Sequence, residues 1–160
     1  MAKKFSYKSI LVVCSVNTAR SRILEGFLKD LFVKKNMNVK VKSGGISSHA
    51  RDGMLISMDA KLVMKEVGII LPEESLSKDL KKYPELIEEA DLIITLTDKH
   101  KEEIHDFYDI NSKEIITLKE FAGEKGDIAD PSMKELEGFR ITRDEIYDCL
   151  MKGLQNYTFK

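Results

Sequence analysis

Near its start the chain contains the run Ser9-Ile10-Leu11-Val12-Val13-Cys14-Ser15-Val16-Asn17-Thr18-Ala19-Arg20-Ser21. Residues 9–13 are almost continuously apolar, which is typical of a parallel strand that is buried on both faces. A polar loop starts at Cys14, and apolar residues then recur at helical spacing from about residue 20 to residue 35. The run therefore predicts a strand, a loop and a helix in direct succession.

The remainder of the chain alternates in the same way. Short β-branched runs at 39–43, 92–96 and 114–118 predict three more strands, and a turn at Gly44-Gly45 is expected after the first of them. Helices are expected at about 57–67, just after Pro84, at 98–107 and at about 133–157. This alternation predicts the α/β class, as a single three-layer domain over residues 1–160 with a four-stranded parallel sheet and helices on both faces.

Composition narrows the classes of protein that fit. The chain has 160 residues, 42% of them hydrophobic and 33% charged, and a net charge of -1, so neither a nucleic acid nor a membrane is expected as a partner. Cys14 and Cys149 are too few for a disulfide framework or a structural zinc site, and no metal or cofactor is expected. No signal-peptide core or membrane span is recognisable, so we expect a cytoplasmic location, where a free thiol stays reduced.

The loop from Cys14 to Ser21 carries the chemistry. Ligands of such sheets bind beyond the carboxyl ends of the strands, where Cys14 is placed. Five residues separate Cys14 from Arg20, enough for backbone N–H groups to surround a phosphate. Arg20 can grip two phosphate oxygens, and its charge favours a Cys14 thiolate as nucleophile. The phosphate-binding residues are then Ser15, Val16, Asn17, Thr18, Ala19, Arg20 and Ser21. The alternative is that Cys14 is only a small buried hydrophobe at a strand end.

A second candidate group lies late in the chain, in Asp127-Ile128-Ala129-Asp130-Pro131. This segment follows the fourth predicted strand and therefore reaches the same edge of the sheet as Cys14. Pro131 favours an extended Asp130, which we interpret as the acid that protonates the leaving group. The alternative is an ordinary acidic turn before a helix, and Asp127 is interpreted as a loop or capping residue.

Together these residues resemble the low-molecular-weight protein tyrosine phosphatases, a family that includes protein-arginine phosphatases and related arsenate reductases. The shared signature is Cys-x-x-Asn-x-x-Arg-Ser, here Cys14 to Ser21, with Asp130-Pro131 near the end. Ser43-Gly44-Gly45-Ile46 and Glu89 to Thr97 resemble two further family segments. The resemblance implies a phosphatase I-like fold, a phosphocysteine on Cys14, and Asp130 as general acid and then base. It also implies a hydrogen-bond network of Asn17, Ser21 and Ser43 that shapes the loop.

The chain departs from the family pattern at several positions. Val16 replaces a frequent glycine, which predicts either a strained or a differently shaped loop. Ala19 replaces a second cysteine, and Arg22 replaces a proline, for which only reduced rigidity at the helix start is expected. The substrate is left open between phosphotyrosine and phosphoarginine, because Thr18 follows Asn17 as in the arginine phosphatases. No aromatic residue follows Pro131, and the loop around His49 is expected at the pocket rim.

Other functions fit parts of the same pattern. A phosphate-binding relative without catalysis remains an alternative, supported only by Val16. An arsenate reductase is less well supported, because it needs two further cysteines in a mobile segment. A sugar-phosphotransferase carrier domain would need neither Arg20 nor Asp130. The expected partner is a phosphorylated protein or a small phosphomonoester, and no oligomeric state is predicted.

Overall fold

The computed structural model describes residues 2–109 and 113–159. The elements in chain order are β1 (Lys3–Lys4), β2 (Ser9–Cys14), α1 (Arg20–Lys34), β3 (Lys40–Gly45), α2 (Met58–Glu66), the 3₁₀ helix η1 (Leu80–Lys82), α3 (Pro84–Glu89), β4 (Leu92–Thr95), α4 (Asp98–Phe107), β5 (Glu114–Thr117), α5 (Leu118–Phe121), α6 (Glu135–Leu154) and β6 (Tyr157–Thr158).

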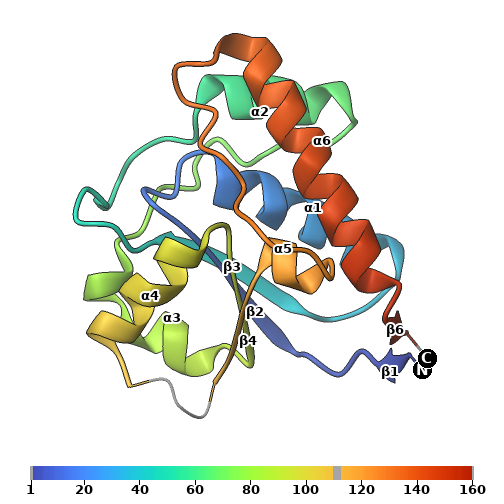
Figure 1. The fold of residues 1–160 in the computed structure, drawn as a ribbon. Helices are drawn as coiled ribbons and strands as arrows, with labels where there is room; N and C mark the ends of the chain where they lie inside the picture. The colour runs from blue at the N-terminus through green and yellow to red at the C-terminus, as the bar shows by residue number, and fades with distance from the viewer. Residues whose placement is uncertain (1, 110–112, 160) are drawn as a thin grey trace.

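Four strands form one parallel sheet, as predicted, and their order in the sheet is β3-β2-β4-β5. Successive side chains of β2 point to opposite faces, and both faces are covered. Ile10 and Val12 pack in the cluster that includes residues of α1, α2, α5 and α6, whereas Leu11 and Val13 pack with residues of η1, α3 and α4. Figure 1 shows these two sets of helices on opposite sides of the sheet. The predicted three-layer α/β fold is therefore confirmed.

The strand order places a topological switch point between β2 and β4. From β2 the chain passes through α1 to β3 on one side, and the later strands β4 and β5 lie on the other side. Connections from β2 and β4 therefore diverge at their carboxyl ends, which is where open α/β sheets bind ligands. Cys14 is the last residue of β2, and Thr95 is the last residue of β4.

The expected turn at Gly44-Gly45 is wrong, because both glycines belong to β3 and pair with Val13 and Cys14. Glycine is needed here for space rather than for a turn. A Cβ on Gly44 would lie 2.5 Å from the Leu80 side chain, and one on Gly45 would lie 2.7 Å from the backbone oxygen of Ser15. The glycines therefore let β3 pass close to η1 and to the loop after Cys14.

The boundaries near the end of the chain also differ from those expected. The strand predicted for 114–118 stops at Thr117, whose side chain forms a capping box with Glu120 and starts the short α5. The last helix begins at Glu135 instead of residue 133 and ends at Leu154. Residues beyond it form β6, which pairs in parallel with β1, so the two termini lie together in Figure 1.

Candidate active site

The loop from Ser15 to Ala19 joins the end of β2 to the first residue of α1, and Ala19 is the residue before that helix. Asn17 has φ 64°, a left-handed position that its short amide tolerates. Val16 does not have a positive φ, so the prediction that its branched side chain strains the loop is wrong. The residue that must adopt the unusual backbone conformation is the asparagine.

The Cys14 thiol is buried at the base of this loop. The backbone N–H of Asn17 lies 3.3 Å from Cys14 Sγ, and Ser21 Oγ lies 3.0 Å from it. The backbone N–H of Lys78 donates to Asn17 Oδ1 at 3.0 Å, so the amide nitrogen faces the other way. It donates to Ser21 Oγ at 2.8 Å and to Ser43 Oγ at 2.9 Å. Because Ser21 accepts from Asn17, its own proton is free to point at a Cys14 thiolate.

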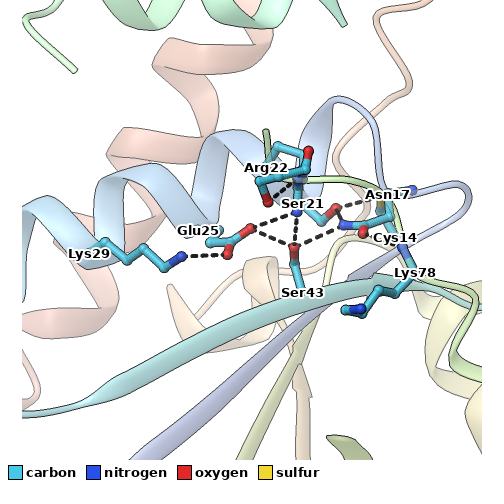
Figure 2. Close-up of polar contacts among 9 residues, drawn as sticks. Cys14, Asn17, Ser21, Arg22, Glu25, Lys29, Ser43 and Lys78 are labelled. Atoms are coloured by element: carbon cyan, nitrogen blue, oxygen red, sulfur yellow. Dashed lines mark hydrogen bonds and ion pairs between the residues drawn. The ribbon is translucent and has the colours of Figure 1, made fainter. Parts of the chain in front are cut away.

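Beneath this network lies a buried ion pair that sequence reasoning did not anticipate (Figure 2). Ser43 Oγ donates to Glu25 at 2.5 Å and accepts from Arg22 at 3.1 Å, while Arg22 also approaches Glu25 at 3.3 Å. Arg22 further donates to the backbone oxygen and hydroxyl of Ser75, and Lys29 pairs with Glu25 at 2.8 Å. Arg22 therefore does more than reduce rigidity at the helix start, because it holds the residues that orient Asn17.

Arg20 is brought over the loop by α1 and is largely buried. Its Nη1 donates to the backbone oxygen of Ile128 at 2.8 Å, and its Nη2 donates to Ser15 Oγ at 3.3 Å. Asp130 Oδ2 lies 4.0 Å from the same Nη2 atom. The two ends of the predicted site, separated by more than one hundred residues, therefore meet at this guanidinium.

Asp130 is half exposed at the mouth of the loop. Burial alone would raise the pKa of Asp130, but hydrogen bonds from the backbone and side chain of Ser132 and the positive charge of Arg20 outweigh it and lower the pKa below its usual value. Asp127 instead accepts from the first backbone N–H of α4, at Asp98, at 2.8 Å. The interpretation of Asp127 as a capping residue therefore agrees with its position.

His100 belongs to the same site, although the sequence reasoning did not select it. It lies in the first turn of α4, is 2% exposed, and places Nε2 2.8 Å from Ser15 Oγ. Burial, followed by the charge of Arg20, lowers the pKa of His100 to about 4. The signal that could have found it is topological, since His100 follows the strand beside β2 at the same carboxyl edge.

The residues expected to select the substrate lie around this mouth. The backbone oxygen of Thr18 accepts from the backbone N–H of Ser57 at 2.9 Å, which ties the loop to the start of α2. Met133 stands in the segment after Pro131, where the tyrosine phosphatases have an aromatic residue and this chain has none. It has φ 72° and is 99% exposed. The loop near His49 begins beside the loop from Ser15 to Ala19, because the backbone N–H of Ser47 donates to the backbone oxygen of Ser15. The His49 side chain itself is exposed.

The described residues offer no other reactive centre of the kinds considered. Cys14 and Cys149 are both free and buried, and burial raises the pKa of Cys149. Within residues 2–109 and 113–159, no three His, Cys, Asp or Glu side chains are grouped so that they could hold a metal ion. Over the same residues, no helix has the length and apolar character needed to cross a membrane.

An α/β sheet with a Cys-x5-Arg-Ser loop at its carboxyl edge has the architecture of a phosphatase that uses a cysteine nucleophile. A model of the family described as low molecular weight phosphotyrosine protein phosphatase matches residues 9–157. The chain therefore belongs to this family, and the resemblance noted from its motifs is confirmed.

Individual relatives carry two different activity names. A protein-arginine-phosphatase of Geobacillus stearothermophilus is 38% identical over 150 residues, which cover 91% of this chain and 95% of that protein. A low molecular weight protein-tyrosine-phosphatase, PtpB, of Staphylococcus haemolyticus is 34% identical over 137 residues, which cover 86% of this chain and 91% of that protein. A solved structure of the YwlE arginine phosphatase, a cysteine-to-serine mutant with a phosphorylated active-site serine, aligns with TM-score 0.79 and 30% identity, covering 92% and 95% of the two chains.

Proposed function

We propose that the protein is a phosphatase that removes phosphate from phosphotyrosine or phosphoarginine side chains of proteins through a phosphocysteine on Cys14. The observation that carries this proposal is the position of Cys14 Sγ. It lies at the base of a loop that Arg20 closes, with the backbone N–H of Asn17 donating to it at 3.3 Å and Ser21 Oγ 3.0 Å away. A thiolate so placed can attack a phosphorus atom bound by the loop.

The first step forms a bond from Cys14 Sγ to phosphorus and breaks the bond from phosphorus to the leaving oxygen or nitrogen. Asp130 gives its proton to that leaving atom. In the second step water attacks phosphorus, Asp130 accepts a proton from the water, and the sulfur–phosphorus bond breaks to release phosphate. Arg20 and the loop N–H groups hold the phosphate oxygens in both steps. The Ser21 hydroxyl stabilises the thiolate before attack and again when it departs.

The ionisation of Asp130 must change between the free and the bound protein. Its pKa lies below the usual value in the free protein, so its carboxylate is charged at neutral pH. A phosphate dianion bound beside it acts in the opposite direction, because a second negative charge disfavours the carboxylate. Substrate binding therefore raises the pKa of Asp130, and the carboxylate takes from solvent the proton that it donates in the first step. No metal or cofactor is proposed for either step.

The phosphorylated active-site serine of the YwlE mutant, which replaces a cysteine, supports covalent transfer of the phosphoryl group to Cys14. Turnover of p-nitrophenyl phosphate tests the proposal in this chain. Wild-type protein should release nitrophenol, and Cys14→Ser should abolish release while inorganic phosphate still binds. Phosphate binding by the wild-type protein without any release of nitrophenol would contradict the enzyme and favour the non-catalytic alternative.

Phosphoarginine is a second candidate substrate, favoured by two features of the site. Thr18 offers a hydroxyl where a bulky aliphatic residue is usual in the tyrosine phosphatases, and the exposed residue after Ser132 is Met133 instead of an aromatic residue for stacking. Rates on phosphotyrosine and phosphoarginine peptides should therefore be compared side by side, in wild type and Thr18→Ile. The substitution should shift the ratio toward phosphotyrosine, and an unchanged ratio would remove Thr18 from substrate selection.

We also propose a cytoplasmic location and phosphorylated proteins as partners, without nucleic acid or membrane binding. The support is chemical: a catalytic thiol must stay reduced, which the cytosol favours. The near balance of charges, with a net charge of -1, gives no bulk attraction to phosphate backbones or anionic lipids.

A further inference from the structure

The imidazole of His100 lies behind the phosphate loop, where the mechanism above gives it no task. It is 2% exposed, and its Nε2 contacts Ser15 Oγ at 2.8 Å. In the described part of the chain, its other ring nitrogen, Nδ1, has no hydrogen-bond partner. The backbone N–H of His100 is held by the Thr97 hydroxyl at 3.1 Å, so α4 holds the ring in place. A buried polar ring with a single polar contact needs an explanation, since such groups are normally paired.

The environment of the ring decides which nitrogen carries the proton. Burial and the neighbouring charge of Arg20 keep His100 neutral at pH 7, so only one nitrogen is protonated. A proton on Nδ1 would leave a buried N–H donor without an acceptor, which native structures rarely tolerate. A proton on Nε2 is instead donated to Ser15 Oγ. The contacts therefore favour the Nε2–H form of the ring.

This form determines what Ser15 can offer to a ligand. Its oxygen accepts from His100 Nε2 and from Arg20 Nη2, which lies at 3.3 Å, so both of its lone pairs are used. The hydroxyl proton is then the part of the side chain left for another partner. Arg20 Nη2 also lies near Asp130, so Ser15 Oγ flanks the same guanidinium that is proposed to grip phosphate. A proton at that point attracts a phosphate oxygen, whereas a lone pair would repel it.

We infer that His100 is a positioning residue that orients the Ser15 hydroxyl as a hydrogen-bond donor to the phosphate oxygen gripped by Arg20. The inference rests on the proposed function only in taking phosphate as the ligand of the loop. It adds a side-chain donor to a site otherwise built from backbone N–H groups and one arginine. Hydrogen bonds to charged groups are stronger than those between neutral groups, so loss of this donor should weaken phosphate binding about tenfold or more.

The test is a double-mutant cycle on phosphate binding, with Ser15→Ala, His100→Ala and the double variant. Binding of inorganic phosphate is measured by calorimetry, and kcat and KM are measured on p-nitrophenyl phosphate. Each single variant should weaken phosphate binding about tenfold, and the double variant should be no weaker than Ser15→Ala alone. If His100→Ala weakens binding by the same factor with and without the Ser15 hydroxyl, the ring acts independently of Ser15 and the inference is wrong.

Conservative variants separate positioning from a general packing defect. The amide nitrogen of Gln reaches approximately the place of Nε2, whereas that of Asn reaches only the place of Nδ1. His100→Gln should therefore recover most of the phosphate affinity, and His100→Asn should not; equal loss in both would overturn the inference. His105→Ala, at an exposed histidine of the same helix, is the matched control and should leave binding unchanged.

Binding and turnover distinguish this inference from the proposed function. If wild-type protein binds phosphate with the expected coupling but releases no nitrophenol, the catalytic proposal fails and the positioning role stands. If turnover is normal but phosphate affinity is the same in wild type and His100→Ala, the positioning role fails and the catalytic proposal stands.

Discussion

At the scale of single residues, the site depends on where protons can point. Asn17 has its amide oxygen held by Lys78 N–H, so its nitrogen must face two serine hydroxyls. Each hydroxyl accepts from Asn17 and keeps its own proton for another group: Ser43 donates to Glu25, and Ser21, which accepts from the Cys14 thiol, can donate to the thiolate. One backbone contact thereby determines the direction of hydrogen bonds as far as the sulfur.

Asp130 should matter most when the leaving group is poor, because a poor leaving group needs its proton during bond breaking. Asp130→Asn is expected to lower kcat/KM, which reports the steps up to loss of the leaving group, by about 10²- to 10⁴-fold on phenyl phosphate and much less on p-nitrophenyl phosphate. Steady-state kinetics on the two esters measures this. Asp127→Asn, which alters a contact to α4 instead, should affect both esters alike and only slightly. An equal loss on the two esters in Asp130→Asn would remove it from the acid role.

The Arg22–Glu25 pair should contribute to stability as well as to loop geometry. Arg22→Met leaves Glu25 buried with less compensation, and removal of one partner of a buried pair costs about 3–5 kcal/mol. Lys29 still contacts Glu25, so the lower part of that range is expected. Urea unfolding measures the change in the free energy of unfolding.

Lys29→Met is the matched control for this prediction, because it removes the other cation that contacts Glu25. The Lys29 side chain is half exposed, so its loss should cost less than about 1 kcal/mol. Equal losses in the two variants would show that burial of the Arg22 guanidinium adds nothing to the pair.

At the scale of elements, the site is made by the close passage of β3 beside the loop. In Gly45→Ala the new Cβ would meet the backbone oxygen of Ser15 at 2.7 Å, so the loop must shift. Phosphate affinity and kcat/KM should both fall at least about tenfold, since misplaced donors lose most of their contribution. Calorimetry with phosphate and kinetics on p-nitrophenyl phosphate measure the effect.

Gly44→Ala is the comparison, since its Cβ would meet the side chain of Leu80 instead of the loop. Overpacking of this kind costs about 1–3 kcal/mol in the free energy of unfolding, with phosphate affinity nearly retained. If the two alanine variants bound phosphate equally well, the close approach of Gly45 to the Ser15 backbone would not control phosphate binding.

Elements could be predicted from the sequence wherever local pattern and final environment agree. The strand at 9–13 and the helix after it were recognisable, because apolar runs and helical periodicity reflect burial directly. The pattern at Gly44-Gly45 was misleading, because paired glycines usually signal a turn and here serve close packing. Neither β1 nor β6 was predicted, since strands of two residues carry no periodicity.

At the scale of the whole molecule, the two ends of the chain are joined away from the site. Phe5 stacks on Phe159 with ring centroids 5.2 Å apart and also contacts Phe32 and Tyr157. This cluster precedes β2 at its amino end, whereas Cys14 ends the same strand. Mutations at the amino end of β2 are therefore expected to change the stability of the protein, and mutations at its carboxyl end to change catalysis.

Phe5→Ala should lower the free energy of unfolding by about 3–5 kcal/mol, because it leaves a cavity among aromatic rings. The kcat/KM of the folded protein should stay unchanged. Urea unfolding and kinetics below the unfolding transition measure the two quantities. Lys3→Ala, an exposed position in β1, should change stability by no more than about 0.5 kcal/mol. A large loss of kcat/KM in Phe5→Ala would show that the terminal cluster and the loop are coupled.

The proposed nucleophile, phosphate clamp and acid could each be selected from the sequence, since Cys14 and Arg20 share one local motif and Asp130 precedes a proline. The sequence by itself determined the α/β class and the family, because periodicity and a short motif are local properties of the chain. Only the tertiary structure decided that Arg22 and Glu25 support Ser43, that two glycines make room for the loop, and that His100 contacts Ser15. The physical reason is that these contacts join residues far apart in the sequence. His100 and Ser15 are 85 residues apart, and only the pairing of β4 with β2 brings them together.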